Sequence, residues 1–151
     1  MSRVVLMLSL LSRFLSLPAG DKIRLLVATM AHLCLPTVLS VGHFDRTRTR
    51  LLWLSNFFES FISDTPTPTR IVWAVEVTDR TLPGSRTCLV RSMTAEALLR
   101  LYDYHPHHRI GVCKTADQDM EAHSWLEYDS KILIGKLENL SDYTPLKAID
   151  R

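Results

Sequence analysis

Cysteine is scarce in this sequence, and its few cysteines do not form pairs. The chain has three in 151 residues, Cys34, Cys88 and Cys113, and none has the C-x-x-C spacing. An odd, widely spaced set does not build the disulfide framework of a small secreted domain and is typical of a reducing compartment. We therefore expect a cytoplasmic protein in which a thiol can stay free and reactive.

An excess of charge of one sign is also lacking. Lysine and arginine together number 18 and aspartate and glutamate 16, so the formal net charge is only +2. This balance provides no global basic field of the kind that binds nucleic acid. We expect no nucleic-acid partner.

Paired zinc-ligand spacings are missing as well. The histidines of the run His105-Pro106-His107-His108 are adjacent in a proline-containing segment, which does not reproduce the spacing of a zinc site even with Cys113 nearby. We expect this run to be a solvated loop and predict neither a metal site nor a cofactor.

No apolar run reaches the length of a membrane-spanning helix. The stretch Val4 to Leu11 is soon followed by Arg13, and the stretch Leu25 to Val41 contains His32 and Pro36. Both fall short of the roughly 20 apolar residues that a spanning helix needs. We expect two helices buried against protein, with attachment to a membrane surface as the less favoured alternative.

A proline-rich segment marks the main division of the chain. Residues 65–69 read Thr-Pro-Thr-Pro-Thr, which favours an extended, stiff connector. Residues 1–64 before it have helical patterning, including the basic run Arg46 to Arg50, which we expect to be a solvated loop or helix start. We predict a helical N-terminal segment over 1–64, suited to partner or substrate contact, and a second domain over 70–151.

Two helices are predicted early in the second domain. Residues 71–80 are compatible with a strand or a helix, and we favour the helix. A better-defined helix begins at Cys88, where Ser85 or Thr87 can cap it. The apolar face of the second helix is formed by Val90, Met93, Ala97, Leu98 and Leu101. The opposite, polar side carries Arg91, Ser92, Glu96 and Arg100.

Short strands follow these helices. Residues 109–113 favour one strand, and residues 121–128 and 131–134 favour a hairpin around Asp129-Ser130. Helices followed by a small antiparallel sheet give an α+β fold, in which we expect the Cys88 helix to cover the sheet.

The position of Cys88 suggests nucleophilic chemistry. A thiol at a helix N-terminus faces unpaired backbone N–H groups and the positive end of the helix dipole, which favours the thiolate. His123, on a strand of the sheet that this helix covers, is the best candidate for the base that removes the thiol proton. The alternative is that Cys88 is a small buried apolar residue, as unpaired cysteines often are.

Several sequence blocks in a fixed order resemble a known family. They are Trp73-Ala74-Val75, Leu82-Pro83-Gly84, Thr87-Cys88-Leu89-Val90, Leu98-Leu99, Ile110-Gly111-Val112 and Ala122-His123-Ser124-Trp125-Leu126-Glu127. Together they are similar to the B2 proteins of lasso peptide biosynthesis, which belong to the transglutaminase-like cysteine protease superfamily. The similarity covers about residues 70–148.

The resemblance implies a leader peptidase with a transglutaminase-like, papain-like core. Such an enzyme cuts a ribosomally synthesised precursor peptide between leader and core, before a partner cyclase closes the macrolactam ring. It implies Cys88 as nucleophile, His123 as general base and acid, and Trp125, Thr87 and Leu89 beside the substrate cleft. It also implies three partners: the precursor peptide, a separate leader-binding protein of the B1 type, and the cyclase.

The third catalytic position is left open. The family often has an acid on the strand after the histidine, but its spacing points to Gly135-Lys136, which is not acidic. We expect Glu138 to take this role, with Glu127 or a backbone carbonyl as alternatives. An amidase or transglutaminase of the same fold, or a peptide-binding scaffold without catalysis, are the rival functions.

Overall fold

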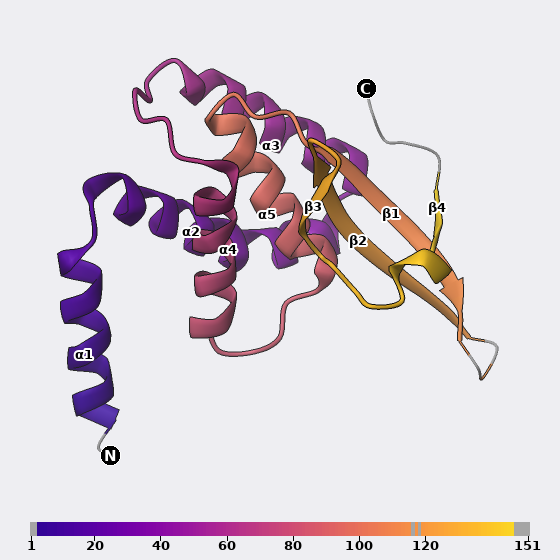
Figure 1. The fold of residues 1–151 in the computed structure, drawn as a ribbon, viewed down its shortest axis with the longest axis horizontal. Helices are drawn as coiled ribbons and strands as arrows, with labels where there is room; N and C mark the ends of the chain where they lie inside the picture. The colour runs from indigo at the N-terminus through magenta and orange to yellow at the C-terminus, as the bar shows by residue number, and fades with distance from the viewer. Residues whose placement is uncertain (1–2, 116, 118, 147–151) are drawn as a thin grey trace.

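The computed structural model describes residues 3–115, 117 and 119–146. Five helices come first: α1 (Arg3–Ser16), α2 (Ala19–Val41), α3 (Phe44–Glu59), α4 (Pro68–Thr81) and α5 (Cys88–Leu101). The strands β1 (His107–Lys114), β2 (Met120–Tyr128) and β3 (Lys131–Ile134) follow, with the short 3-10 helix η1 (Leu140–Asp142) and β4 (Thr144–Pro145) at the end. Figure 1 shows this order, and the predicted α+β class is confirmed.

The helix over residues 71–80 is confirmed, but it begins earlier than the connector prediction allows. The Thr67 side chain accepts a hydrogen bond from the backbone N–H of Arg70 at 3.3 Å, and Pro68 occupies the first turn, where its missing N–H costs nothing. The extended connector therefore ends at Thr67. Pro36 does not end α2, which continues to Val41.

The strands form one antiparallel sheet in the order β3-β2-β1-β4. The predicted hairpin is confirmed: Asp129 and Ser130 have φ values of 49° and 60°, the combination that a two-residue turn between twisted strands requires. The register of β2 and β3 shifts between Leu126 and Glu127, so the pairing does not continue evenly away from the turn.

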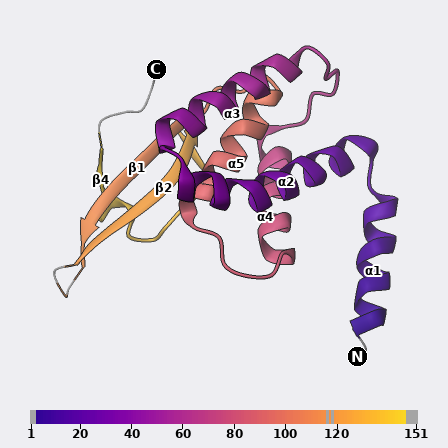
Figure 2. The ribbon, with the colours of Figure 1, turned by 180° about the vertical axis from the view of Figure 1, so that it is seen from behind.

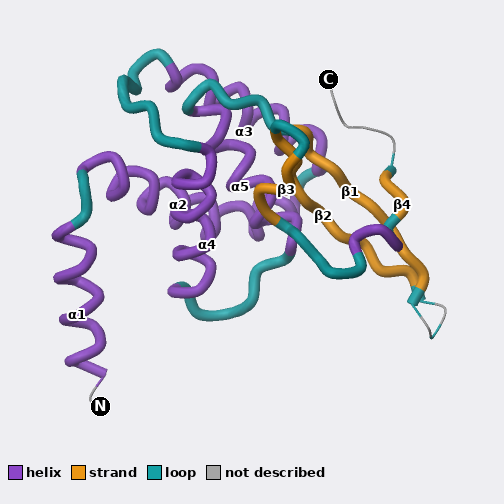
Figure 3. Tube along the Cα trace, viewed as in Figure 1, coloured by secondary structure: helices purple, strands orange, loops and turns teal. Residues whose placement is uncertain are grey.

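Helix α5 lies at the centre of the molecule. It packs on α2, α3 and α4 and also on β2, so that the helices gather on one side and the strands on the other (Figure 3). The apolar core between these layers consists of Ala28, Ile71, Val72, Val75, Ala95, Leu98, Leu99, Leu126 and Ile134. Helices from both sides of the connector thus share one core, and the division into 1–64 and 70–151 stays a prediction.

The N-terminal helices expose much of their apolar surface, contrary to the expectation that they are buried against protein. The large exposed apolar side chains of these helices, together with Phe61 just after α3, are Leu8, Leu11, Leu15, Ile23, Leu26, Val27, Met30, Leu33, Val38, Val41, Trp53, Leu54, Phe57 and Phe58. Helix α1 extends away from the body in both views (Figures 1 and 2). Because α2 begins at Ala19, it is long and apolar enough to cross a membrane, contrary to the expectation from the run Leu25 to Val41, and only 22% of its most apolar window is buried. Core helices and signal sequences share that length and composition, so α2 alone does not assign a location.

Candidate active site

Cys88 is the first residue of α5, as predicted. Thr87 caps the helix, its hydroxyl accepting a hydrogen bond from the Val90 N–H at 3.3 Å. The thiol is free and half-buried. Because Cys88 begins the helix, its thiol lies near the first backbone N–H groups of α5, which have no hydrogen-bond partner within the helix.

The sheet-facing side of α5 carries Cys88. Ser92 follows it by one turn on the same face, and the Ser92 hydroxyl lies 2.6 Å from the hydroxyl of Ser124 on β2. Further along the same face, Leu99 packs in the core with Leu126 of β2. Helix α5 thus lies beside the part of β2 around Ser124. Since Ser124 faces α5 and β1 and β2 pair without a bulge, the side chain of its neighbour His123 points to the other face of the strand. No hydrogen bond joins the His123 ring to the Cys88 sulfur within the described residues.

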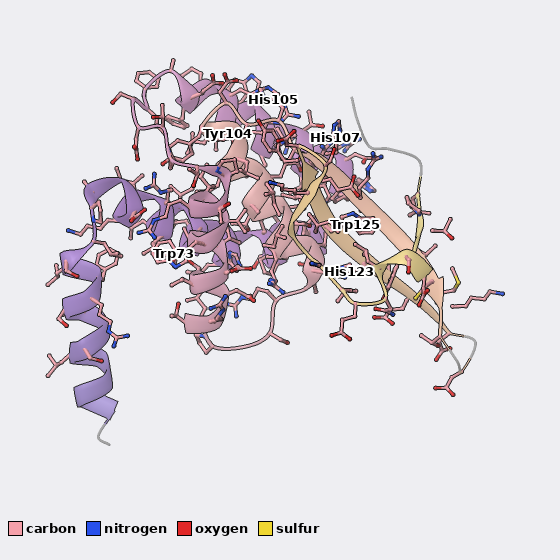
Figure 4. All side chains as sticks on the ribbon, viewed as in Figure 1. Trp73, Tyr104, His105, His107, His123 and Trp125 are labelled. Carbon is pink, nitrogen blue, oxygen red and sulfur yellow. The ribbon has the colours of Figure 1, made fainter. Side chains whose placement is uncertain are left out.

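The His123 ring is held in a defined orientation. Its Nε2 lies 2.7 Å from the carbonyl oxygen of Gly135, and since a carbonyl only accepts, Nε2 carries the proton. The ring stacks against Trp125, with centroids 6.1 Å apart and planes 14° apart, and contacts Tyr143 at 5.6 Å. The neutral ring therefore keeps its lone pair on Nδ1, the atom that a proton-accepting base needs. Figure 4 shows His123 and Trp125 together on the sheet.

The place expected for Glu138 is taken by the Gly135 carbonyl, the last of the three alternatives. Glu138 is exposed and has no hydrogen bond or ion pair with the described residues. Glu127 accepts instead from Trp125 Nε1 at 2.8 Å and from Arg109 at 3.4 Å. Strand β3 ends at Ile134, and the backbone turns at Gly135, whose φ is +83°, so that a main-chain carbonyl meets the imidazole.

Glycine is needed at position 135 for this contact. Its φ is +83°, and a Cβ there would come within 2.6 Å of the Ser124 carbonyl oxygen and 2.8 Å of Trp125 Cβ. Only a residue without a side chain permits both the backbone conformation and the close approach.

The residues expected at the cleft lie in two different places. Trp125 is 3% exposed, so it supports the His123 ring rather than forming an open wall. Thr87 and Leu89, on either side of Cys88, line a groove of about 570 Å³ whose opposite wall is α2. The N-terminal segment thus contributes to the surface beside the thiol.

A buried ionic group was missed by sequence reasoning. His108 is 1% exposed and lies on β1, not in a solvated loop, and Glu96 is fully buried although its helix side was predicted to be polar. Nδ1 of His108 lies 2.7 Å from Glu96, and Arg48, predicted to be solvated, donates to the same carboxylate at 3.0 Å. Burial alone would raise the pKa of Glu96, but the hydrogen bonds from His108 and Arg48 hold it below its ordinary value. Extending the β1 strand pattern by two residues would have placed His108 on the face of Ile110.

The remaining cysteines and histidine have separate environments. Cys34 is exposed, and Cys113 is half-buried. A hydrogen bond with Cys113, with a further contribution from burial, raises the pKa of Tyr143. His32 is fully buried, and burial lowers its pKa. No group of three potential metal ligands occurs among the described residues.

Comparison with known proteins identifies a superfamily. No curated protein and no solved structure matches the chain. Residues 31–148 match the sequence model of the transglutaminase-like superfamily, a region that contains Cys88, His123 and Gly135. Members of this superfamily are typically cysteine proteases or acyltransferases of papain-like fold. The match covers well over half of the sequence, and the chain belongs to the transglutaminase-like superfamily.

Proposed function

We propose that this protein is a cysteine endopeptidase that removes the leader from a ribosomally synthesised lasso precursor peptide before macrolactam cyclisation. The observation that carries the proposal is the orientation of the His123 ring. Its Nε2 is bonded to the Gly135 carbonyl, which leaves Nδ1 for proton transfer, and His123 belongs to the strand that packs against α5, the helix that begins with Cys88. The sequence blocks around Cys88 and His123 that resemble B2 proteins supply the substrate class.

The first half of the reaction forms a thioester. Nδ1 of His123 takes the proton of the Cys88 thiol, and the thiolate sulfur attacks the carbonyl carbon of the scissile peptide bond. The resulting oxyanion is stabilised by backbone N–H groups at the start of α5. The C–N bond then breaks as the imidazolium returns its proton to the leaving amine, which becomes the N-terminus of the core peptide.

The second half releases the leader. His123 takes a proton from water, the hydroxide attacks the thioester carbonyl, and the C–S bond breaks. The proton returns to the Cys88 sulfur and the leader leaves with a free carboxyl group. Throughout, the Gly135 carbonyl accepts from Nε2 and stabilises the imidazolium, the role that an acid fills in a Ser-His-Asp triad.

The partners follow from the same proposal. The exposed apolar helices α1 to α3 offer a surface for a B1-type leader-binding protein and for the cyclase, which would bring the precursor to the thiol. We place the protein in the cytoplasm, where its three cysteines stay reduced.

The test is cleavage of precursor peptide by purified protein with its leader-binding partner, followed by mass spectrometry. We expect Cys88→Ala to lower kcat by at least about 10⁴-fold, and His123→Ala nearly as much, because the two residues act as a unit. Cys34→Ala, which removes an exposed thiol on α2, is the matched control and should keep full activity. Undiminished cleavage by Cys88→Ala would refute the catalytic assignment. Addition of an amine in place of hydrolysis would identify an acyltransferase instead.

A further inference from the structure

A chain of buried polar side chains connects α3, α5 and the two central strands, and the mechanism above does not use it. Arg48 on α3 donates to Glu96 on α5, which accepts from Nδ1 of His108 on β1 at 2.7 Å. All three side chains are at most 8% exposed. Buried charged and polar groups of this kind are stable only when every partner is in place.

The chain continues through two serines. Nε2 of His108 lies 2.7 Å from the Ser124 hydroxyl on β2, and that hydroxyl lies 2.6 Å from the hydroxyl of Ser92 on α5. The Ser92 hydroxyl also lies 3.1 Å from His108 Nε2 and donates to the Leu89 carbonyl at 3.1 Å. The last members of the chain are thus the sequence neighbours of the proposed catalytic pair: Leu89 follows Cys88, and Ser124 follows His123.

Hydrogen bonds fix a position that apolar contacts leave loose. Elsewhere α5 meets β2 through aliphatic side chains such as Leu99 and Leu126, and such contacts tolerate small sliding movements. The hydrogen bonds of 2.6 and 2.7 Å through Ser124 would be lost after a shift of about 1 Å, because hydrogen-bond geometry is confined to a narrow range of distances.

We propose that Ser92, Ser124 and His108 are positioning residues that set the first turn of α5 against β2. They thereby hold the Cys88 sulfur at the correct distance from Nδ1 of His123. This inference rests on the proposed function, since it assumes that these two atoms exchange a proton. None of the three residues touches substrate.

The first experiment removes single hydroxyl groups. Ser92→Ala and Ser124→Ala should each lower kcat by about 10- to 100-fold with KM unchanged, the cost of a small misplacement of reacting groups. Ser124→Thr, which keeps a hydroxyl, should restore most of the activity. The matched control is Thr94→Val: Thr94 is a buried hydroxyl of the same helix that donates to Val90 of its own helix at 2.8 Å, and its loss should leave kcat within about twofold of wild type.

The second experiment separates positioning from stability. His108→Gln places an amide nitrogen near the Nε2 position and can keep the bond to Ser124, whereas His108→Asn can keep only the bond to Glu96. Positioning predicts a higher kcat for His108→Gln than for His108→Asn, whatever the order of their melting temperatures. A purely structural role predicts that kcat follows the melting temperature.

The third measurement does not need the peptide substrate. The rate of Cys88 alkylation by iodoacetamide is followed against pH with Cys34 and Cys113 replaced by alanine. An imidazole that holds the thiolate gives a reactive thiol at acidic pH, and His123→Ala removes this reactivity. We expect Ser124→Ala and Ser92→Ala to remove most of it and Thr94→Val to keep it.

The outcomes distinguish the two proposals. If the alkylation rate of Cys88, measured in the variant that lacks Cys34 and Cys113, does not depend on His123, the proposed function fails. If it depends on His123 but is the same in both serine variants as in Thr94→Val, the positioning role is refuted and the proposed function stands. If Ser124→Ala does not fold, Ser92→Ala carries the test, because alanine is favoured in helices.

Discussion

At the scale of single residues, the partner of the His123 ring is the main departure from expectation. An uncharged carbonyl stabilises an imidazolium less than a carboxylate does, so the proposed mechanism requires precise placement of one main-chain atom. That placement depends on the conformation of Gly135 and not on any side chain of the third strand.

The assignment of the Gly135 carbonyl as the partner of His123 can be tested by two substitutions with opposite expected outcomes. We expect Gly135→Ala to lower the free energy of unfolding by about 1–3 kcal/mol and kcat by more than tenfold, because a Cβ would strain the backbone and displace the carbonyl. Glu138→Gln should leave kcat within about twofold of wild type. Urea titration and steady-state kinetics give both quantities.

Gly84 provides the control for this pair. Its φ is also positive, at +86°, but an added Cβ would meet only the flexible Arg86 side chain at 3.3 Å. Gly84→Ala should therefore cost stability without lowering kcat. A tenfold fall in kcat for Glu138→Gln would return the third role to that carboxylate.

At the scale of elements, the ionic group around Glu96 joins α3 and α5 to β1. A carboxylate in this setting is stabilising only while it is ionised and paired. Its folded pKa lies below the ordinary value of 4.5, so its contribution to stability is present above that value and is lost as pH falls through the folded pKa.

We expect the ionised Glu96 carboxylate to make a pH-dependent contribution to the free energy of unfolding, which the substitution Glu96→Gln removes. Glu96→Gln should destabilise the protein by about 3–5 kcal/mol at pH 7, because Arg48 and His108 then lack their anionic partner. Below pH 5, the free energy of unfolding should fall less steeply with decreasing pH in this variant than in wild type. Urea titrations over a pH series measure this difference.

Glu76→Gln, on the exposed side of α4, is the control and should change neither quantity by more than about 0.5 kcal/mol. Parallel pH curves for Glu96→Gln and wild type would contradict the assignment.

At the scale of the whole molecule, the exposed apolar surface is concentrated on the first three helices. The aromatic side chains near the end of α3 form one cluster, in which Trp53 stacks on Phe57 and Phe57 contacts Phe58 and Phe61. Trp53 is 66% exposed and Phe61 74%, so these side chains contribute little to folding. A large exposed apolar patch is typical of an interaction site.

We expect the variant Trp53→Gln, Phe57→Gln, Phe61→Gln to bind the purified leader-binding protein or cyclase at least tenfold more weakly. Its free energy of unfolding should change by less than about 1 kcal/mol, since the side chains are exposed. Titration calorimetry and urea unfolding measure the two effects. Met120→Gln is the control, because Met120 is 63% exposed but lies on β2, away from this cluster. Unchanged binding to both proteins, together with loss of sedimentation with lipid vesicles, would assign the cluster to a membrane surface.

The amino-acid sequence by itself determined most of the helices and strands and their order, but not β4 or the extension of β1 to His107. The spacing of apolar residues predicted the helix at Cys88, the turn residues predicted the hairpin at Asp129-Ser130, and the neighbours of Cys88 and His123 indicated the superfamily. These signals are local, because propensity, capping and strand alternation act within a few residues.

Only the tertiary structure decided which polar groups meet. The end of β3 at Ile134 and the turn at Gly135 gave His123 a carbonyl partner in place of a carboxylate, and the packing of α3, α5 and β1 buried His108 and Glu96 together. Such pairings join residues distant in sequence and depend on register to within one residue, and no local pattern specifies that register. The burial of a charged residue likewise depends on partners supplied by other elements of the fold.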